Sequence, residues 1–598
     1  MPTHYHLAMP APATHLFHVA IMVPDAPAPT TDLVLPSWLP GWYIISDHAR
    51  HVQDFAALDA DGHPLPWSKV DKARWRVTNG GGSFQVRYQV HANHLAVFAS
   101  HLDESHALFN PVDVFMYVDG AKHQPCLLTV IPPPDWGWRV TLTLDPAEGE
   151  SVFYAPDYHA LADSPGEVGT HRLLSFEVDG LPHHLALYGH GNEDADRLVA
   201  DLARIVATAR DVCGELPYPW YTFVLLLGDR PTGGMEHARC SINHVSRFSF
   251  QPLRDYERVL SLLAHEFFHV WNVKRIRPHA FDDYDYEREM YTESLWIVEG
   301  ATSYYDDLIL TRAGLLTPER FLERLADDIR EYERTPAREL YNLTEASFDT
   351  WLKMYRAYDN APNNRVNFYL KGALVHLLLD LEIRRRTHGT CSLDDVFRTL
   401  WADYKARGAG YADTDYKTIV ESVVGGRLDD FWARYVDGRD PLDFDSLLAD
   451  VGLRLTRSHQ ADKDLERTGG RPGVERGYLG ITTRVDNGRL LVQTAYAGSP
   501  AHAAGLTPGD ELLALDGFRL TEATLPHRLD ERAPGEVVTI TVFRRDELHQ
   551  VQVTLGARSP DNYRLAVVPD ATAEQRACFR AWLGVDLPAP DPAKEASP

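Results

Sequence analysis

The hydrophobic pattern of this chain changes its period twice, and these changes constrain the fold of the 598 residues more than any other feature. Short alternating runs broken by Pro, Gly and Asp, such as FHVAIMV and SFQVRYQV, fill the first 190 residues and predict antiparallel strands. From about residue 192 the apolar residues recur every three to four positions, as in EDADRLVADLARIVATARDVCGEL, which predicts helices. Strand-like alternation returns after the stretch 461–477, which is Gly-rich and charged and has the composition of a linker.

These changes predict a multidomain α+β protein. At about 150 residues per domain, a chain of this length holds roughly four units. We expect an N-terminal antiparallel β domain over residues 1–190 and a mixed domain with a helical C-terminal part over 191–460. A small β-rich domain over 466–558 and a C-terminal helix and tail over 559–598 should follow.

The composition excludes several classes of protein. Hydrophobic residues make up 44% and charged residues 24% of the chain, which is typical of folded globular proteins. Lys and Arg number 59 against 85 Asp and Glu, and the net charge of −26 argues against binding to nucleic acid or to an anionic membrane. The five cysteines are far apart and show no CxxC spacing, which favours a reducing compartment. Because the N-terminus lacks a basic segment followed by an apolar run, and no stretch approaches the roughly 20 apolar residues of a membrane span, we expect a soluble, cytoplasmic protein.

The strongest functional signal is the segment SLLAHEFFHVWNV, in which His265, Glu266 and His269 form an H-E-x-x-H pattern. Residues four apart share one face of a helix, so the two imidazoles can bind one Zn²⁺. Glu266 lies beside the first imidazole and can take a proton from a water that attacks a carbonyl carbon. The apolar flanks predict a buried helix, in which these polar side chains need a partner such as a metal ion. We therefore predict one Zn²⁺ per chain and the hydrolysis of an amide bond.

A zinc site of this type needs a third protein ligand, and spacing alone does not select one among the acidic residues that follow. Most of them belong to DDYDYERE, a dense run of charge that is typical of an exposed loop. Glu299 differs because it stands in an apolar helical stretch, where an unpaired carboxylate would be costly. The candidates are Asp282, Asp283, Asp285, Glu287, Glu289, Glu293 and Glu299.

The segments HEFFHVWNVKRIRP and LWIVEGATSYY closely resemble the M61 metallopeptidases, the glycyl aminopeptidase family, and more distantly the M1 aminopeptidases. The segment PSWLPGWYI, near the N-terminus, is also typical of M61 proteins, so the resemblance extends over most of the chain. It implies a thermolysin-like (gluzincin) zinc peptidase domain over 191–460, with Glu299 as the third zinc ligand. Because Glu299 follows His269 by 30 positions, more than in M1, we expect a loop between the two ligand helices.

The segment TGGMEHARCS resembles the G-x-M-E-N element of the M1 enzymes, in which the glutamate receives the free α-amine of the substrate. The resemblance implies a substrate-binding role for Gly233, Gly234, Met235 and Glu236. The residue types fit this role, since glycines let a substrate backbone approach an edge strand and a carboxylate pairs with an ammonium group. A β-turn with an exposed acid is the alternative. His237 stands where the M1 enzymes have Asn, so the geometry at this end of the cleft can differ.

The segment NNRVNFYLKGALVHLL resembles the M1 stretch that supplies a transition-state tyrosine. The resemblance implies that Tyr369 donates a hydrogen bond to the oxyanion of the tetrahedral intermediate. Tyr304 and Tyr305 are rivals for this role, and Tyr369 could instead be a core aromatic at the start of a helix. Asp306, seven positions after Glu299 and so on a similar face, is a candidate for orienting a ligand histidine, although the sequence favours a surface position for it.

The segments GYLGI and SPAHAAGLTPGD resemble a PDZ domain, which would occupy residues 466–558. In that fold the loop formed by Tyr478, Leu479, Gly480 and Ile481 offers backbone N–H groups to the carboxylate at the end of a peptide, beside a groove that accepts an added strand. Packing against the peptidase domain, and capture of the chain's own tail, are alternative roles for this module.

Together these features predict a zinc-dependent aminopeptidase that removes N-terminal residues from peptides by attack of a metal-activated water. The preference for Gly, with Ala as a second choice, is implied by the family resemblance alone. We expect the partners to be peptides with a free N-terminus, with a C-terminal peptide as an additional ligand of the PDZ domain. The alternatives are a zinc endopeptidase assisted by the PDZ domain and a non-catalytic scaffold that binds peptides through it.

Overall fold

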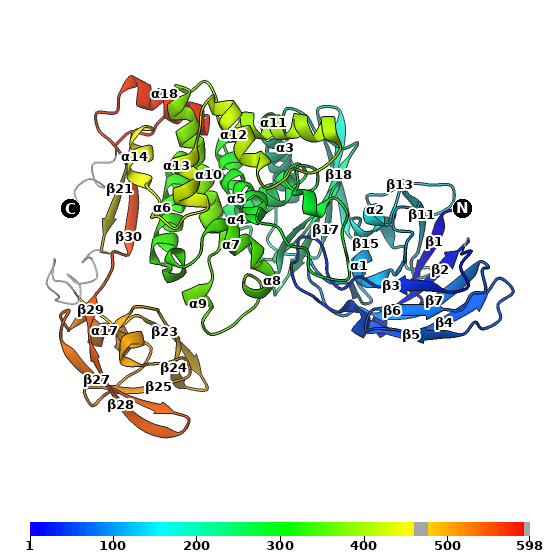
Figure 1. Cartoon of the computed structure of the whole chain (residues 1–598), viewed down its shortest axis with the longest axis horizontal. Helices are drawn as coiled ribbons and strands as arrows, with labels where there is room; N and C mark the ends of the chain where they lie inside the picture. Colours follow the sequence, from blue (N-terminus) through cyan, green and yellow to red (C-terminus); the bar gives the residue numbers. More distant parts are fainter. Residues whose placement is uncertain (25, 460–475, 591–598) are drawn as a thin grey trace. The chain divides into compact units, whose positions relative to one another are not determined.

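The computed structural model describes residues 1–24, 26–459 and 476–590, and it confirms the expected multidomain α+β class (Figure 1). The predicted linker, 461–477, lies almost entirely outside the described residues. The chain divides into two compact units. The first unit contains residues 1–294, 305–316 and 393–423, and the second unit contains residues 295–304, 317–392 and 424–598. One helix, α5 (Leu295–Arg312), contributes to both units.

The first unit begins with three β-sheets, which form the expected N-terminal β domain. Their strand orders are β13-β14-β11-β1-β2-β7-β4, β10-β3-β6-β5 and β12-β15-β9-β8. Neighbouring strands are antiparallel, except that β1 and β11 pair in parallel. The strands are β1 (Thr3–Ala8), β2 (Leu16–Val23), β3 (Thr31–Val34), β4 (Val52–Asp59), β5 (Trp67–Lys69), β6 (Arg74–Val77), β7 (Phe84–His91), β8 (His101–Leu102), β9 (His106–Phe109), β10 (Tyr117–Val118), β11 (Cys126–Ile131), β12 (Arg139–Thr141), β13 (Asp145–Pro146), β14 (Val152–Ala155) and β15 (Gly166–Gly169).

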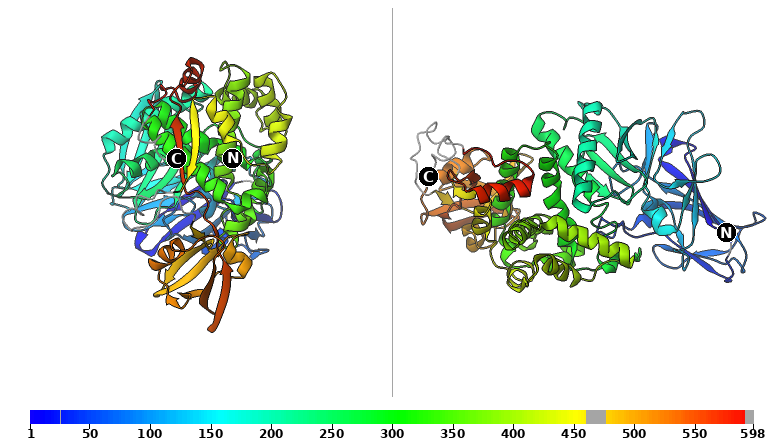
Figure 2. Two further views of the ribbon diagram at one scale, coloured as in Figure 1. Left: turned by 90° about the vertical axis from the view of Figure 1, so that its left-hand side faces the viewer. Right: turned by 90° about the horizontal axis from the view of Figure 1, so that it is seen from above.

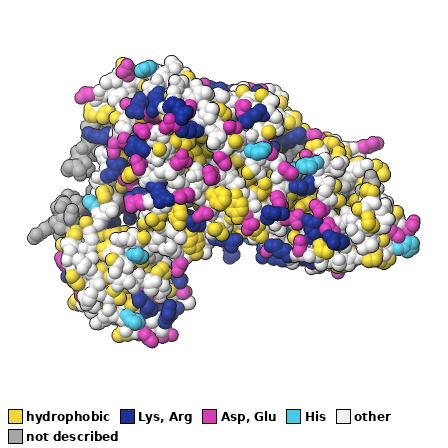
Figure 3. All heavy atoms as spheres, viewed as in Figure 1, with side chains coloured by type: hydrophobic (Ala, Val, Ile, Leu, Met, Phe, Trp, Pro, Cys, Tyr) yellow, Lys and Arg dark blue, Asp and Glu magenta, His cyan; other side chains and the backbone are white. Residues whose placement is uncertain are grey.

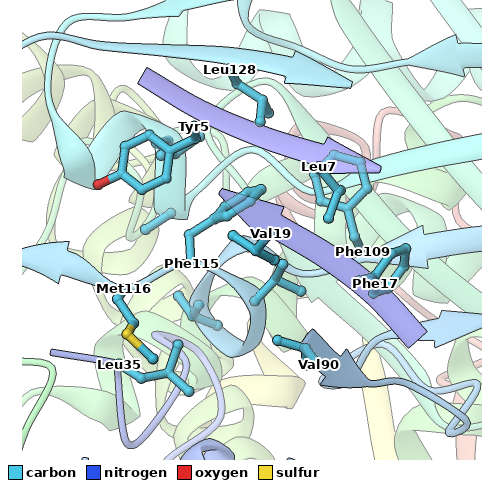
Figure 4. Packing of buried hydrophobic residues seen from close by; sticks show 14 of the residues in the cluster. Tyr5, Leu7, Phe17, Val19, Leu35, Val90, Phe109, Phe115, Met116 and Leu128 are labelled. Atoms are coloured by element: carbon cyan, nitrogen blue, oxygen red, sulfur yellow. The ribbon is translucent and has the colours of Figure 1, made fainter. Parts of the chain in front are cut away.

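Alternation of side chains between the two faces of a strand builds the core of these sheets. In β2 the side chains of Phe17 and Val19 are buried while that of His18 is exposed, as the sequence pattern predicts. Figure 4 shows Phe17 and Val19 close to Phe109 and Phe115 in one apolar cluster. The same cluster includes buried residues of the next sheet, so the hydrophobic core continues past residue 190.

That next sheet is mixed, and it positions the functional segments. Its strand order is β16-β17-β18-β20-β19, so β19 forms one edge. The central strand β18 is buried along its whole length and pairs in parallel with both neighbours, which is why its sequence is almost continuously apolar. Helix α4 packs against β19 and β20. The elements are β16 (Arg172–Val178), β17 (Leu181–Tyr188), β18 (Tyr221–Gly228), β19 (Gly233–Glu236), β20 (Cys240–Ser246), α1 (Pro111–Val114), α2 (Tyr158–Ala162), α3 (Ala195–Cys213), α4 (Leu253–Phe268), α11 (Leu393–Arg407) and α12 (Asp415–Val424).

The second unit is largely helical outside the predicted PDZ domain, and two of its helices cross where neither has a side chain. A methyl group added to Gly300 of α5 would stand 2.6 Å from the Cα of Gly372 in α10, and one added to Gly372 would stand 2.9 Å from the Cα of Gly300. The crossing therefore requires glycine on both helices. The helices here are α6 (Pro318–Arg334), α7 (Leu343–Phe348), α8 (Thr350–Lys353), α9 (Ala361–Asn364), α10 (Phe368–Arg386), α13 (Asp429–Phe431) and α14 (Phe444–Ala449).

The predicted PDZ domain is inserted between two strands that pair with each other. β21 (Leu453–Ser458) and β30 (Asn562–Val567) are antiparallel, with Ser458 opposite Asn562. The module between them has its own sheet and its own core, and its strands stay together in every view (orange in Figures 1 and 2). After β30, helix α18 (Ala573–Leu583) buries Trp582, whose indole N–H donates a hydrogen bond of 2.9 Å to the hydroxyl of Tyr304 in α5. The module contains β22 (Gly477–Tyr478), β23 (Ile481–Asp486), β24 (Arg489–Ala495), α16 (Pro500–Ala504), β25 (Glu511–Leu515), β26 (Phe518–Arg519), α17 (Thr524–Asp530), β27 (Val537–Arg544), β28 (Glu547–Thr554) and β29 (Gly556–Ala557).

The surface carries charge of both signs. Figure 3 shows Lys and Arg side chains interspersed with Asp and Glu on the face in view. Acidic residues exceed basic ones over the whole sequence, which gives the net charge of −26. Among the described residues, no helix combines the length and the hydrophobicity that crossing a bilayer requires.

Replacing Gly372 by Ala should force α5 and α10 apart, because the added methyl group would overlap the backbone of α5. Overpacking of this kind costs about 1–3 kcal/mol, so we expect a melting temperature several degrees lower by calorimetry. The matched control is Gly426→Ala, since a methyl group there meets no atom within 4 Å. Equal melting temperatures for the two variants would contradict the close crossing.

Candidate metal centre

Helix α4 carries the H-E-x-x-H residues at its C-terminal end. Leu263 and Phe267 on this helix are fully buried, as the apolar flanks of the pattern predict. His269 and Glu266 are also buried, and the side chain of His265 is only 13% exposed. Burying two imidazoles and a carboxylate in such surroundings is unfavourable unless each of them is paired.

The two imidazoles turn the same nitrogen toward each other. The Nε2 atoms of His265 and His269 are 3.1 Å apart. On the other side of its ring, Nδ1 of His269 lies 2.7 Å from the carbonyl oxygen of Asn272, which can only accept a hydrogen bond. Nδ1 of His265 lies 3.5 Å from a carboxylate oxygen of Asp306. In neutral rings the proton is therefore expected on Nδ1, and each Nε2 presents a lone pair to the other.

The third predicted ligand approaches from α5. This helix is continuous, so Glu299 and Asp306, seven residues apart, lie on one face of it. The contact between Asp306 and His265 fixes where that face lies. One nitrogen each of His265 and His269 and one carboxylate oxygen of Glu299 lie within 4.8 Å of one another. The sequence favours a surface position for Asp306, and the structure places it instead against a ligand histidine, where it can orient the ring.

These three donors fit a zinc ion. Two lone pairs 3.1 Å apart repel each other unless a positive charge lies between them. Two histidine nitrogens and a carboxylate oxygen are a donor set that Zn²⁺ accepts in sites that keep a fourth position open. At Zn–N distances of about 2.1 Å and a tetrahedral angle, two nitrogens are about 3.4 Å apart, close to the observed separation. His265, His269 and Glu299 would therefore hold the ion.

Glu266 lies beside this donor set and beside a second carboxylate. Atoms of Glu236, Glu266 and His269 lie within 4.8 Å of one another, and all three residues are buried. The edge strand β19 approaches Glu266 so closely that a methyl group on Gly234 would stand 2.3 Å from Glu266 Oε1. The sequence predicts that Gly234 lets a substrate backbone approach the strand. In the structure, the space that a side chain at Gly234 would take is occupied by the carboxylate of Glu266. Gly233 has a φ of +91° and open space where a side chain would stand.

The segment PSWLPGWYI of the N-terminal domain packs against Glu236. Gly41 in this segment has a φ of +95°, and a methyl group on it would stand 2.7 Å from Met235 Sδ and 2.8 Å from Glu236 Oε1. Met235 and Glu236 are both buried. The space directly beyond the Glu236 carboxylate is therefore filled by backbone, which gives one end of β19 a wall.

A largely buried ion pair, in which the Asp163 side chain is 23% exposed, holds the residues next to Glu236. Asp163, which follows α2, accepts hydrogen bonds from His237 Nδ1 at 3.0 Å, from the backbone N–H of Ala238 at 2.9 Å and from Lys274 Nζ at 2.7 Å. Burial alone would raise the pKa of Asp163, but the charge of Lys274 and the hydrogen bond from His237 hold it well below its usual range. His237, the residue that departs from the M1 pattern, is thus an anchor for the strand that carries Glu236.

Two of the three tyrosines considered for the oxyanion have other partners. The hydroxyl of Tyr304 donates to Asp380 at 2.7 Å and accepts from Trp582. The hydroxyl of Tyr305 donates to Asp394 at 2.9 Å. Both tyrosines therefore join helices to one another.

Tyr369 lies in the first turn of α10, and its hydroxyl is hydrogen-bonded to that of Tyr355. Tyr355 carries no signal in the sequence, because nothing in its neighbourhood predicts that the chain folds back onto α10. Three residues after Tyr369, Gly372 meets Gly300, which directly follows Glu299. The helix of the predicted oxyanion donor therefore crosses the helix of the predicted third ligand next to that ligand.

Four of the other acidic candidates for the third ligand, namely Asp282, Asp283, Asp285 and Glu287, have basic partners. Asp282 pairs with Arg277 at 2.8 Å, and Glu287 pairs with Arg74 at 2.8 Å. The run DDYDYERE is expected from its charge to be a largely solvated loop, and these ion pairs instead attach it to neighbouring segments. Charge density alone could not reveal these partners, because Arg74 is 213 residues away in the sequence.

The predicted carboxylate-binding loop of the PDZ domain connects β22 to β23. The loop begins at Tyr478, and the side chain of Leu479 is buried in the core of the module. Gly480 has a φ of +82°, and a methyl group there would stand 2.2 Å from the Cβ of Ser499, so this turn requires glycine. β23, which begins at Ile481, forms one edge of the module's sheet, where a further strand can be added.

Three family models match this chain. The model described as the Peptidase M61 N-terminal domain matches residues 4–170, that of the M61 glycyl aminopeptidase matches 258–375, and that of the PDZ domain matches 477–555. A crystal structure of an aminopeptidase N family protein from Idiomarina loihiensis is 31% identical, with a TM-score of 0.88. That similarity covers 97% of this chain and 100% of the other.

Two curated relatives are similar over shorter stretches. A protein of Hahella chejuensis named as a DegP-like periplasmic serine endoprotease is 32% identical over 109 residues, which are 16% of this chain and 23% of that protein. A protein of Neisseria meningitidis named as a zinc metalloprotease is 26% identical over 202 residues, which are 32% of this chain and 43% of that protein. The chain thus spans less than half the length of these curated relatives.

Removing the carboxylate of Glu299 tests the donor set. In Glu299→Ala one of three ligands is lost, so we expect the zinc content of the purified chain, measured by mass spectrometry after dialysis, to fall from about one per chain to a small fraction. Glu293→Ala, an exposed acid six residues earlier, is the control and should keep its zinc. Full zinc occupancy in Glu299→Ala would remove Glu299 from the site.

Asp163→Asn tests the anchor beside Glu236. Leaving the ammonium group of Lys274, whose side chain is 7% exposed, without its partner should cost about 2 kcal/mol, less than in a fully buried pair because Asp163 is partly exposed. Because the pKa of Asp163 is lower in the folded chain than the value of about 3.9 in an unfolded one, its contribution is present at neutral pH and is lost as the pH falls below about 4.

The difference in melting temperature between the original chain and Asp163→Asn should therefore be largest near neutral pH and shrink in acid. The control is Asp145→Asn, whose carboxylate pairs with Arg239 at the surface and should contribute less than about 1 kcal/mol. Equal effects of the two substitutions at pH 7 would contradict the anchoring role.

Proposed function

Because the chain belongs to the M61 family of peptidases, we propose that it is a zinc-dependent aminopeptidase that removes N-terminal residues from peptides. The observation that carries the proposal is the convergence of His265, His269 and Glu299, with Glu266 beside them. The proposed preference for Gly, and for Ala as a second choice, is supported by the description of the matching family model and by the sequence resemblance.

Bound zinc would act as a Lewis acid that lowers the pKa of water from 15.7 to about 7. Glu266 is the residue that takes a proton from the attacking water and returns it to the leaving amine, since its carboxylate lies beside the ligand His269. Its burial, and its close packing against Gly234, hold this carboxylate in one place.

Glu236 is proposed to bind the free α-amine of the substrate. A buried carboxylate on an edge strand can pair with an ammonium group while the peptide extends along that strand. One carboxylate oxygen of Glu236 lies within 4.8 Å of Glu266 and of the ligand His269. A substrate whose α-amine binds Glu236 would therefore have its first peptide bond near Glu266, which fits removal of the N-terminal residue. The wall that Gly41 forms against Glu236 supports removal of terminal residues over cleavage inside a chain.

Tyr369 is proposed to donate a hydrogen bond to the oxyanion that forms during attack. Two observations support this role: α10 crosses α5 next to Glu299, and the hydroxyl of Tyr355 can orient that of Tyr369.

An endopeptidase that receives chain ends from its PDZ domain is the second candidate. The free edge of β19 favours it, because an extended chain of any length could add to that edge. The buried Glu236 argues for the aminopeptidase, since a peptide bond in the interior of a chain offers no charge to a carboxylate.

Glu266→Gln tests the general base. The variant should keep its zinc and lose about 10²–10⁴ in kcat, because the amide cannot accept the proton. Asp255→Asn, in the first turn of the same helix, is the control and should retain activity. Normal turnover in Glu266→Gln would exclude Glu266 as the base.

Glu236→Gln separates the two candidate functions when it is assayed on the same peptides with free and with acetylated N-termini. Loss of a charged hydrogen bond should lower kcat/KM for the free peptides by about 10- to 100-fold and leave any hydrolysis of acetylated peptides unchanged. An original chain that cleaves acetylated peptides as fast as free ones would favour the endopeptidase and reject amine recognition.

A further inference from the structure

A cavity of about 450 Å³ in the second unit lies where the PDZ domain meets the helices. On the helical side it is lined by the C-terminal part of α6, the turn that follows, α9 and the start of α10. On the PDZ side it is lined by Tyr478, the first residue of the predicted carboxylate-binding loop, and by Tyr496, which follows β24.

The lining of this cavity is strongly basic, although the chain as a whole carries a net charge of −26. Among the residues that the structure describes, Glu331 is the one acidic residue of the lining. Five basic residues also line the cavity, namely Arg330, Arg334, Arg338, Arg365 and Lys371.

Two of the five cations are already neutralised, since Arg330 pairs with Asp327 and Arg338 pairs with Glu339. The other three form no ion pair with any residue in the described ranges 1–24, 26–459 and 476–590. Arg365 donates to a backbone carbonyl, Lys371 reaches only a carbonyl at 3.4 Å, and Arg334 lines the cavity together with Tyr478. Three positive charges thus line one cavity, and none of them forms an ion pair with a described residue.

Lys371 is the most confined of the three. It is 1% exposed, and this burial lowers its pKa to about 8. A buried ammonium group without a carboxylate partner is unfavourable, so an anion entering the cavity would be stabilised by restoring its charge.

The PDZ domain is attached at this face by specific contacts. The side-chain amide of Asn363 in α9 donates to the carbonyl of Ala495 at 2.9 Å and accepts from the N–H of Ala497 at 2.8 Å. The loop that begins at Tyr478 thus borders the basic lining, and β23, which follows this loop, is an edge strand of the module's sheet. A peptide that adds to β23 with its carboxylate at the loop would place its last residues next to these cations.

We propose that this cavity binds the C-terminal end of an acidic peptide. The PDZ loop would take the terminal carboxylate, and Arg334, Arg365 and Lys371 would pair with acidic side chains near that end. The bound segment would touch Asn367, which caps the N-terminus of α10, and Leu370 in the first turn of this helix, which also carries Tyr369. The proposal goes beyond the peptidase activity and does not require it.

The test uses the full chain carrying Glu266→Gln, so that binding is measured without hydrolysis. The probe is a decapeptide labelled at its N-terminus, with two acidic residues among its last three and a free C-terminus, followed by fluorescence anisotropy. We expect saturable binding that weakens at least tenfold when the C-terminus is amidated, and at least tenfold when the two acids are replaced by Ser.

The double substitution Arg334→Ala with Arg365→Ala should weaken binding of the acidic peptide at least tenfold. Arg334→Lys with Arg365→Lys should retain most of it, which distinguishes lost charge from lost folding. Arg489→Ala, on β24 of the same PDZ domain and outside the cavity, should leave the affinity unchanged. Equal affinities for the acidic and the Ser-substituted peptides, or an unchanged affinity in the double Ala variant, would overturn the proposal.

Discussion

The Nε2 atoms of His265 and His269 face each other at 3.1 Å on one buried helix, and the groups around them are arranged to stabilise this close approach. Their lone pairs can stay together only if a positive charge offsets the repulsion. The surrounding groups act on this pair, since Asn272 and Asp306 engage the outer nitrogens and Glu299 brings a negative charge to the inner side. A metal centre of this kind is as much a matter of protonation as of position, because only neutral rings can serve as ligands.

The site also depends on glycines, at positions where there is no space for a side chain. At Gly41, Gly234, Gly300 and Gly372, a single methyl group would overlap a functional side chain or the helix beside it. In the first unit, Gly41 and Gly234 let backbone meet the carboxylates of Glu236 and Glu266. In the second unit, Gly300 and Gly372 let the backbones of α5 and α10 meet each other. Packing this close holds charged groups without adding polar partners that would compete with a substrate.

The parts of the site that could be predicted are those encoded locally. A spacing of four residues places His265 and His269 on one helical face, and an apolar setting singles out Glu299. The roles of Asp163 and Tyr355 could not be predicted, because each depends on a partner brought close by the fold and a lone acid or tyrosine has no pattern. The spacing of seven residues from Glu299 made Asp306 a candidate for orienting a ligand histidine, but the sequence favoured a surface position for it. The fold class followed from hydrophobic periodicity, whereas the pairing of β21 with β30 spans about a hundred residues and left no local signal. The Gly preference and the cytoplasmic location stay predictions.

The chain passes through the PDZ domain and then returns to the helical region, and this path limits how the module can be separated. Cutting the chain after β21 would discard β30 and α18 as well, and with them the indole of Trp582 that caps Tyr304 on the ligand-bearing helix α5. A loss of activity after such a truncation would therefore say nothing about peptide docking. Excision is the informative operation: Ser458 and Asn562 are cross-strand neighbours, so a tight hairpin between them would delete the module and leave the ribbon intact.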